Sequence, residues 1–301
     1  MTTTSHTKTA AVDWEDPSRS VVVGVDGSER NKAAIAWATH QALGAGHPVT
    51  LLHVLDDYAF PVPHHSMDSD NERGWRVLNQ VKADLITSHP ALAVRHEMAS
   101  GATVRRLLDR SVEQAMLVVG KRGLSAIART MVGSTSIGVA GRARVPVIIV
   151  PDVWRQADHH DEPIVVGIDP DKVHERTLRF AFAQAQRRLV GVHVVYAIDL
   201  DPVLAGDPGA VSANVYERAR ERGADRVKDA VLPYRREFPD VPVQHSELRG
   251  DPGSALLHVA KRAQMIVLGG NHSSRIGFPL GSVTRGILHH STVSVAVVPT
   301  R

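Results

Sequence analysis

A glycine-rich element in the first half of the chain has the spacing of a phosphate-binding loop. Gly120-Lys121-Arg122-Gly123 is followed by nine residues and then by Gly133-Ser134-Thr135-Ser136, which gives Gly-x2-Gly-x9-Gly-[Ser/Thr]. Glycine lets backbone N–H groups approach a ligand closely, and the start of a following helix offers unpaired donors and a positive dipole end. The element therefore indicates a phosphate site. The same residues also fit a tight turn at Gly120 and Gly123 with Ser134 as a helix cap.

Motifs of several other functional classes are missing from the sequence. It contains no Gly-x4-Gly-Lys-[Ser/Thr] loop, no Gly-x-Gly-x-x-Gly after the first apolar run and no Gly-x-Ser-x-Gly nucleophile elbow. Seventeen histidines are present, but His96-Glu97 and His174-Glu175 both lack the second histidine of a His-Glu-x-x-His zinc motif. We therefore expect no resident metal site and assign no catalytic residues.

Composition limits the range of partners and locations. The hydrophobic share of 43% supports packed cores, and no apolar stretch is long enough to span a membrane. The formal net charge is only +3, with basic residues scattered among acidic ones, so no nucleic-acid partner is expected. Residues 1–18 are polar and lack the apolar run of a signal peptide, and the chain has no cysteine. These features predict a flexible N-terminal tail and a cytoplasmic protein that does not bind membranes.

The elements that must position the glycine element occur twice. The run Val21 to Asp26 returns as Ile164 to Asp169 at an offset of 143 residues, and Met116 to Gly120 returns as Met265 to Gly269 at an offset of 149. Gly133-Ser134 reappears as Gly281-Ser282 at an offset of 148. Ordered anchors with small changes of offset indicate a duplication, with an insertion of six residues and a deletion of one in the second copy.

Each copy alternates buried strands with amphipathic helices. In the first copy, strands are predicted at 21–25, 49–55, 94–98, 116–119 and 145–150, and helices at 31–43, 71–87, 102–114 and 134–143. Right-handed crossovers then give an α/β fold of two tandem Rossmann-like domains, each a five-stranded parallel sheet with helices on both faces. The predicted boundaries are a tail at 1–18, domains at 19–151 and 163–301, and a linker at 152–162. Ligands of such folds bind at the carboxyl ends of the strands.

The chain resembles the universal stress protein family from about residue 20 to residue 300. The resemblance rests on the opening Val-Gly-Val-Asp-Gly-Ser, on the strand that ends in Leu52-His53-Val54, and on the glycine element before Val145-Pro146-Val147. It identifies the chain as a tandem-domain member of the ATP-binding branch. The resemblance implies that ATP, together with Mg²⁺, is the ligand. Asp26 is also open to a second interpretation, as a turn residue that caps the first helix.

The resemblance implies one set of ATP-binding residues in each domain, with the nucleoside held near the aspartate and the phosphates held by the glycine element. In the first domain these are Gly24, Asp26, Val54, Gly120, Lys121, Arg122, Gly123, Gly133, Ser134, Thr135 and Ser136. In the second they are Gly167, Asp169, Ala197, Gly269, Gly270, Gly281, Ser282, Val283 and Thr284.

The second copy departs from the glycine pattern. Its loop from Gly269 to Gly281 is one residue shorter, His272 stands where the first copy has Gly123, and Pro279 removes a backbone N–H. A side chain at His272 would hinder the approach of phosphate, whereas Gly270 or Gly277 would allow the turn to re-form. The sequence leaves open whether this second site binds ATP.

Three functions remain in competition. The first is an ATP-binding, nucleotide-dependent regulator in a stress or growth-arrest response, acting on a regulatory protein that the sequence does not identify. The second is a slow ATP-hydrolysing enzyme, at most a weak ATPase, and the third is an interaction scaffold with vestigial nucleotide sites. The intact first-copy element favours the first. As members of the family pair through their last strands, we also expect homo-oligomers and an internal pseudo-dimer that pairs 145–150 with 293–298.

Overall fold

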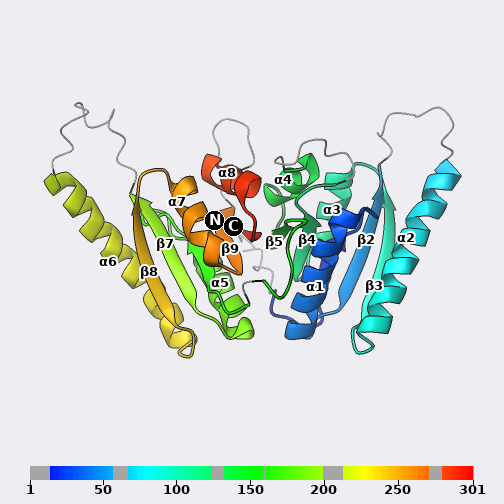
Figure 1. The fold of residues 1–301 in the computed structure, drawn as a ribbon, viewed down its shortest axis with the longest axis horizontal. Coiled ribbons are helices and arrows are strands. Elements are labelled where there is room, and N and C mark those ends of the chain that lie inside the picture. Colours follow the sequence, from blue (N-terminus) through cyan, green and yellow to red (C-terminus); the bar gives the residue numbers. More distant parts are fainter. Residues whose placement is uncertain are drawn as a thin grey trace, which may run out of the picture.

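A computed structural model of the chain shows two halves of the same design (Figure 1). It describes residues 14–56, 67–123, 132–158, 160–198, 213–270 and 280–300. The elements of the first half, in chain order, are β1 (Val21–Gly24), a 3-10 turn (Glu29–Asn31), α1 (Lys32–Ala45), β2 (Val49–Leu55), α2 (Met67–Ser88), β3 (Val94–Ser100), α3 (Thr103–Ser111), β4 (Met116–Gly120), α4 (Ser134–Ala140) and β5 (Val147–Val150). Those of the second half are β6 (Ile164–Gly167), α5 (Glu175–Arg188), β7 (Val192–Ile198), α6 (Ala213–Glu237), β8 (Val243–Arg249), α7 (Pro252–Val259), a 3-10 turn (Ala260–Arg262), β9 (Met265–Gly270), α8 (Ser282–His290) and β10 (Ser294–Pro299).

The strands form one continuous sheet across both halves. Its order is β3-β2-β1-β4-β5-β10-β9-β6-β7-β8, and every neighbouring pair is parallel except β5 and β10, which are antiparallel. Val295, Ala296 and Val297 pair with Ile149, Ile148 and Val147 at this seam. The fold class and the pairing of the last strands are therefore as predicted. Each half supplies five strands and covers both faces of its part of the sheet.

Successive strand residues face two different helical layers. Val21 and Val23 pack into the core beneath α1, α2, α5 and α6, whereas Val22 packs into the core beneath α3, α4, α7 and α8. Because side chains alternate across a pleated strand, a run of valines fills both layers at once. The seam residues divide in the same way, with Ala296 in the first core and Val295 in the second, so both cores run through both halves.

The insertion in the second copy lies between β7 and β8. Strands β2 and β7 keep the offset of 143 residues, while β3 and β8 are offset by 149. Helix α6 has 25 residues against 22 in its counterpart α2. The six additional residues therefore leave the strands unchanged and fall in the connection that carries α6.

The N-terminal segment differs from the predicted flexible tail. Trp14 is 4% exposed and meets Phe180 of the second half edge to face, with ring centroids 5.6 Å apart. Glu15 forms an ion pair of 3.3 Å with Arg179 on the same helix, α5. Trp14 and Glu15 thus pack against the second half, because an indole ring gains from burial beside α5. Residues 1–13 lie outside the described part of the chain.

Several element boundaries also differ: α2 begins at Met67 rather than at residue 71, and α4 ends at Ala140 rather than at residue 143. Helix α3 ends at Ser111 rather than at residue 114, since Glu113 takes a left-handed φ of 66°. Strand β5 starts at Val147 rather than at residue 145 because Pro146, immediately before it, has no N–H to donate to a ladder. Over the described ranges, no helix combines the length and apolar character needed to cross a lipid bilayer.

Candidate functional site

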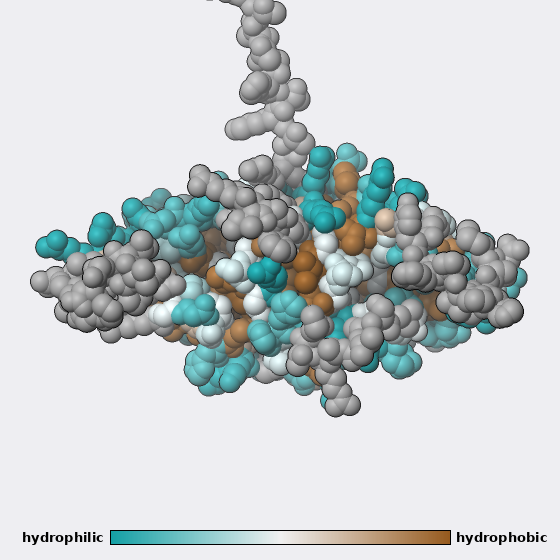
Figure 2. Space-filling model, turned by 90° about the horizontal axis from the view of Figure 1, so that it is seen from above, coloured by the Kyte–Doolittle hydropathy of each residue, from teal (hydrophilic) through white to brown (hydrophobic). Residues whose placement is uncertain are grey.

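The predicted site residues gather at the carboxyl ends of the strands. The chain leaves β1 toward β2 on one side and later returns to β4 on the other, and β6 is flanked by β7 and β9 in the same way. Such a reversal of strand order opens a crevice that ligands use in open α/β sheets. Seen from this edge, apolar and neutral residues come into view near the middle of the molecule (Figure 2).

In the first half, the ends of β1 and β4 bring Asp26 and Gly123 together. A Cβ atom added to Gly123 would lie 3.3 Å from Oδ2 of Asp26. Oδ1 of the same carboxylate accepts a hydrogen bond of 2.8 Å from the N–H of Ser28. Oδ1 of Asp26 therefore bonds the turn, and Oδ2 faces the glycine element. The N-cap of α1 is Asn31, so Asp26 is a turn residue but does not cap the first helix. Gly24 is the last residue of β1, and Val54 is the second-last residue of the adjacent strand β2.

The two ends of the glycine element are held together by hydrogen bonds. The N–H of Gly133 donates to the carbonyl of Lys121 at 2.9 Å, and the Ser136 hydroxyl donates to the carbonyl of Gly120 at 2.7 Å. Ser136 is buried, Thr135 is half-buried and Ser134 is exposed. The Ser136 hydroxyl thus braces the loop, while Ser134 and Thr135 stand at the start of α4. The residues from 124 to 131 lie outside the described residues.

The side chains of Lys121 and Arg122 are engaged by other segments of the protein. Nζ of Lys121 donates to the carbonyls of His289 and Ser291, at 2.8 and 2.9 Å, in the second half. Arg122 forms an ion pair with Asp152. Burial lowers the pKa of Lys121, and the charge of Arg122 adds to this effect. Both side chains thus make contacts between segments of the protein, and only their backbone remains in the glycine element.

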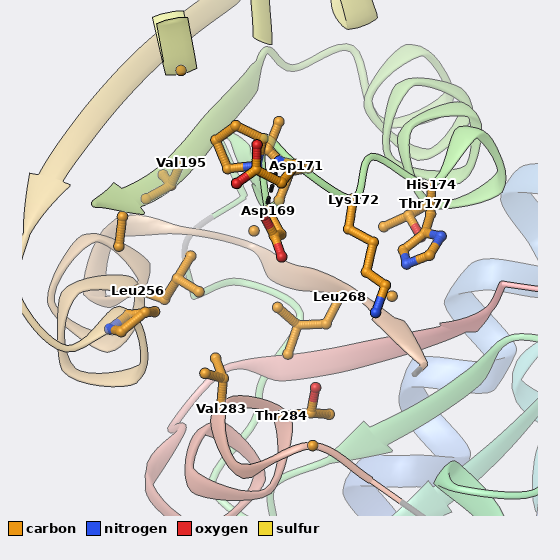
Figure 3. A pocket seen from close by; sticks show the side chains of 18 of the residues that line it. Asp169, Asp171, Lys172, His174, Thr177, Val195, Leu256, Leu268, Val283 and Thr284 are labelled. Atoms are coloured by element: carbon orange, nitrogen blue, oxygen red, sulfur yellow. Dashed lines mark hydrogen bonds between the residues drawn. The ribbon is translucent and has the colours of Figure 1, made fainter. Parts of the chain in front are cut away.

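The second half contains a cavity of about 700 Å³ at the equivalent strand ends (Figure 3). Eight of the nine residues predicted for this half line it: Gly167, Asp169, Ala197, Gly269, Gly281, Ser282, Val283 and Thr284. The ninth, Gly270, is not among the lining residues, and its carbonyl accepts a hydrogen bond of 2.9 Å from Thr300. The departures singled out in the sequence, His272 and Pro279, lie outside the described residues.

One wall of the cavity is the first turn of α8. Gly281 precedes this helix of nine residues with φ −64° and ψ 159°, and no side chain caps the helix there. The first N–H groups of a helix have no partner within it and carry the positive end of its dipole. Leu256, Leu268 and Val195 supply an apolar wall. This combination suits a ligand with an apolar or aromatic part and an anionic part.

Sequence reasoning missed the lining residues that follow β6 and those on α6 and α7. These are mainly Asp171, Lys172, His174, Thr177, Ala219, Arg222, Gly223, Arg226 and Pro252. A residue-by-residue comparison of the two copies could have found three of them. When the copies are aligned at the offset of 143 residues, Lys172, His174 and Thr177 correspond to Glu29, Asn31 and Ala34. The second copy therefore has a basic side chain and a hydroxyl side chain that the first copy lacks.

The acidic groups of the cavity are already engaged by neighbours. Oδ1 of Asp169 accepts from the N–H of Asp171 at 2.9 Å, and Asp171 forms an ion pair with Arg226. Burial lowers the pKa of His174; the nearby Lys172 lowers it further and Asp169 opposes the effect. In the described parts of the chain, no group of three or more His, Cys, Asp or Glu residues is placed to hold a metal ion.

Comparisons with known proteins agree with the duplicated fold. The model of the universal stress protein family matches residues 17–151 and again residues 162–299. A universal stress protein of Mycolicibacterium smegmatis is 30% identical over 93% of this chain and 97% of its own length. The crystal structure of a universal stress protein from Archaeoglobus fulgidus covers 94% of the chain with a TM-score of 0.68 and 18% identity, over 98% of its own chain. Another structure from that organism, a complex with dAMP, is 27% identical over 46% of this chain and 97% of its own, with a TM-score of 0.34.

Proposed function

Because the chain belongs to the universal stress protein family, we propose that it binds ATP, accompanied by Mg²⁺, at the carboxyl ends of its strands and acts as a nucleotide-dependent regulator in a stress or growth-arrest response. The proposal assigns the nucleoside to the side of the second-half cavity formed by Asp169 and Ala197. It assigns the phosphates to Gly269 and the first turn of α8.

The cavity is the observation that carries the proposal. Its volume of about 700 Å³ falls in the range of about 300–1,000 Å³ that small-molecule sites occupy. Apolar side chains form one wall, and the free N–H groups of a helix start form another. A nucleotide has an aromatic base and an anionic tail, which match these two walls. The first half repeats the arrangement of strand ends, with Asp26 beside Gly123.

Magnesium enters this proposal with the nucleotide rather than as a resident ion. The described residues offer no cluster of three or more protein ligands, and the two cavity aspartates are already bonded. Mg²⁺ retains waters and binds through phosphates with few protein ligands in many nucleotide sites. The residues near the phosphates would therefore orient the nucleotide, and its occupancy would be the regulatory signal.

A matched pair of variants tests the proposal. A Cβ at Gly281 would have no heavy atom within 4 Å, and one at Gly133 would meet its nearest atom, the Lys121 carbonyl oxygen, at 3.6 Å. Both positions have a φ that any residue can adopt. Gly281→Glu and Gly133→Glu should therefore fold and place a carboxylate where phosphate would bind. Loss of one charge-assisted hydrogen bond weakens binding about ten- to hundredfold, before repulsion is counted.

Calorimetry with ATP and Mg²⁺ measures the affinity, and the amount of nucleotide bound per chain measures the number of sites. We expect the parent to prefer ATP to GTP, Gly281→Glu to lose the second-half site, and Gly133→Glu to lose any first-half site. Equal affinity for ATP and GTP would remove the adenine assignment. Retention of all nucleotide by both variants, with unchanged circular dichroism, would reject the strand ends as the site. The regulatory role requires that Gly281→Glu fail to restore stress survival to a strain that lacks the protein.

A further inference from the structure

Three side chains at the start of α5 form an additional polar wall in the second-half cavity. In Figure 3, Lys172 extends from the connection after β6 toward Leu268, and His174 and Thr177 lie beside it. Thr177 is 2% exposed, and its hydroxyl has no hydrogen-bond partner among the residues that the structure describes. A buried hydroxyl without a partner is unfavourable and uncommon in folded proteins. Thr177 lines a cavity, so a bound ligand can supply the missing hydrogen-bond partner of its hydroxyl.

The wall adjoins the end of β9. A Cβ at Gly269 would lie 3.0 Å from Cδ2 of His174 and 3.3 Å from Oγ1 of Thr177. A glycine here therefore keeps the strand backbone close to both side chains. On the far side of β9, the first turn of α8 carries Thr284, which Figure 3 shows below Lys172. Donors from α5, from α8 and from the Lys172 ammonium thus face the same part of the cavity.

The first half has no equivalent wall. Glu29 stands in place of Lys172 and forms an ion pair of 2.7 Å with Lys32. Asn31 stands in place of His174 and donates its side-chain N–H to the carbonyl of Gly24 at 2.9 Å. Ala34 replaces Thr177 and carries no polar group. The extra donors are therefore specific to the second half and are not required by the repeated fold.

We propose that Lys172 and Thr177 contact the distal phosphates of the nucleotide, which makes the second half selective for a nucleoside triphosphate over a monophosphate. This inference rests on the function proposed above. Val195 and Ala197 lie on β7, where the nucleoside is assigned, and Figure 3 shows Val195 across the cavity from Lys172. A phosphate chain that leaves this side and passes the first turn of α8 arrives at Lys172. Of the other two cavity cations, Arg226 is paired with Asp171, and Arg222 lies on α6.

The experiment measures ATP and AMP affinities in full-length protein that carries Gly133→Glu, so that only the second half binds. Lys172 is exposed, and Lys172→Glu introduces the residue type that the first half has. Thr177→Val keeps the shape and removes the hydroxyl. Arg218→Glu is the charge-matched control, because Arg218 is exposed on α6, is not among the lining residues of the cavity and undergoes the same change of charge.

We expect Lys172→Glu to weaken ATP binding about ten- to hundredfold more than AMP binding, and Thr177→Val to weaken ATP binding about tenfold. Arg218→Glu should change the ratio of the two affinities by less than about threefold, since a charge outside the cavity lining acts only through the general field. Without ligand, Thr177→Val should melt no lower than its parent, because the hydroxyl makes no bond within the described structure. A hydroxyl with a purely structural role would instead lower the melting temperature and leave the affinities unchanged.

Other outcomes would overturn the inference. If the Gly133→Glu parent binds ATP and AMP equally, and Lys172→Glu changes neither, the distal-phosphate contact is wrong while nucleotide binding stands. An effect of Arg218→Glu as large as that of Lys172→Glu would likewise reject the assignment to Lys172. If wild-type protein binds no nucleotide in either half, the proposed function itself fails and the inference fails with it.

Discussion

Arg188 joins the two halves, and no carboxylate among the residues that the structure describes forms an ion pair with it. Its guanidinium donates to Gln41 of α1 at 2.9 Å and to Gln264 at 3.3 Å, and lies 5.4 Å from the centroid of the Trp37 ring. Gln41 and Trp37 belong to the first half, while Arg188 ends α5 in the second. A planar guanidinium can serve amide oxygens and an aromatic face at the same time. One residue thereby links α1, α5 and the segment before β9.

His47 is a buried titratable residue close to the same contact between the halves. It follows the left-handed glycine that ends α1, and it is 3% exposed. Burial lowers the pKa of His47, and the nearby charge of Arg187 adds to this effect. The folded protein therefore holds this ring neutral at a pH where the unfolded chain, with a pKa near 6.5, begins to bind a proton.

We predict that the free energy of unfolding falls as the pH drops below about 6.5, and that His47→Leu makes this fall less steep. Because the folded-state pKa is the lower one, the unfolded state gains protons first, and stability is lost on acidification. Each pH unit over which one proton binds only on unfolding costs about 1.4 kcal/mol. Urea titrations from pH 7.5 to 5.0 measure the slope. His258→Leu, at an exposed position on α7, is the control. Equal slopes for parent and His47→Leu would contradict the prediction.

At the scale of elements, α8 connects the second-half cavity with the glycine element of the first half. Its first residue, Ser282, lines the cavity, and its last turn receives the ammonium of Lys121. The ring of His289 also accepts a hydrogen bond of 3.4 Å from the N–H of Val132, next to Gly133. The carbonyls at a helix C-terminus favour a cation, so Lys121 acts as a C-terminal partner for α8.

Removal of this partner should destabilise the protein. Lys121→Met leaves the carbonyls of His289 and Ser291 without their Nζ donor in a buried region. This loss should lower the free energy of unfolding by about 1–3 kcal/mol. Lys32→Met is the control, since the ion pair of Lys32 with Glu29 is largely exposed and such pairs contribute about 0–1 kcal/mol. Urea denaturation gives the difference as a shift of midpoint at constant slope. A loss no larger than that of the control would show that α8 does not depend on Lys121.

At the scale of the whole molecule, the two halves share one sheet and both cores. The seam between β5 and β10 is fully buried, with Ile148 and Ala296 both 0% exposed. Neither half therefore buries its edge strand without the other. An edge of this kind, apolar and unpaired, would be a site for association with other chains.

We therefore predict a single cooperative unfolding transition and a strong effect of one charge at the seam. Ala296→Asp places an unpaired carboxylate in the shared core, which should lower the free energy of unfolding by more than about 3 kcal/mol. Trp37 and Trp75 lie on α1 and α2, and Trp14 packs against Phe180, so fluorescence reports mainly on the first half and its contact with the second. Far-ultraviolet dichroism reports on the helices and strands of both halves. The two midpoints should fall together although the substitution is in the second half. Gln244→Asp, exposed on the outer strand β8, is the control. Separation of the two midpoints would show that the halves unfold independently.

The sequence by itself determined the repeat, the order of elements and the edge of the sheet at which the candidate site residues lie. β-Branched runs such as Val21 to Val23 indicate strands buried on both faces, and the spacing of apolar residues in 31–43 indicates a helix, because both periods follow from local backbone geometry. The predicted strand at 49–55 coincides with β2. Strict alternation then implies parallel pairing and places both glycine elements at the carboxyl ends.

Only the tertiary structure decided which side chains face the cavity and which join the halves. Lys121 lies inside the glycine motif, yet its ammonium binds carbonyls about 170 residues away in sequence. Thr177 sits in an ordinary helical pattern, and its unsatisfied hydroxyl beside Gly269 appears only when α5 and β9 are packed. Trp14 precedes the first strand and is nevertheless buried against Phe180. Such contacts depend on the docking of elements distant along the chain, and hydrophobic periodicity describes only the neighbours within one element.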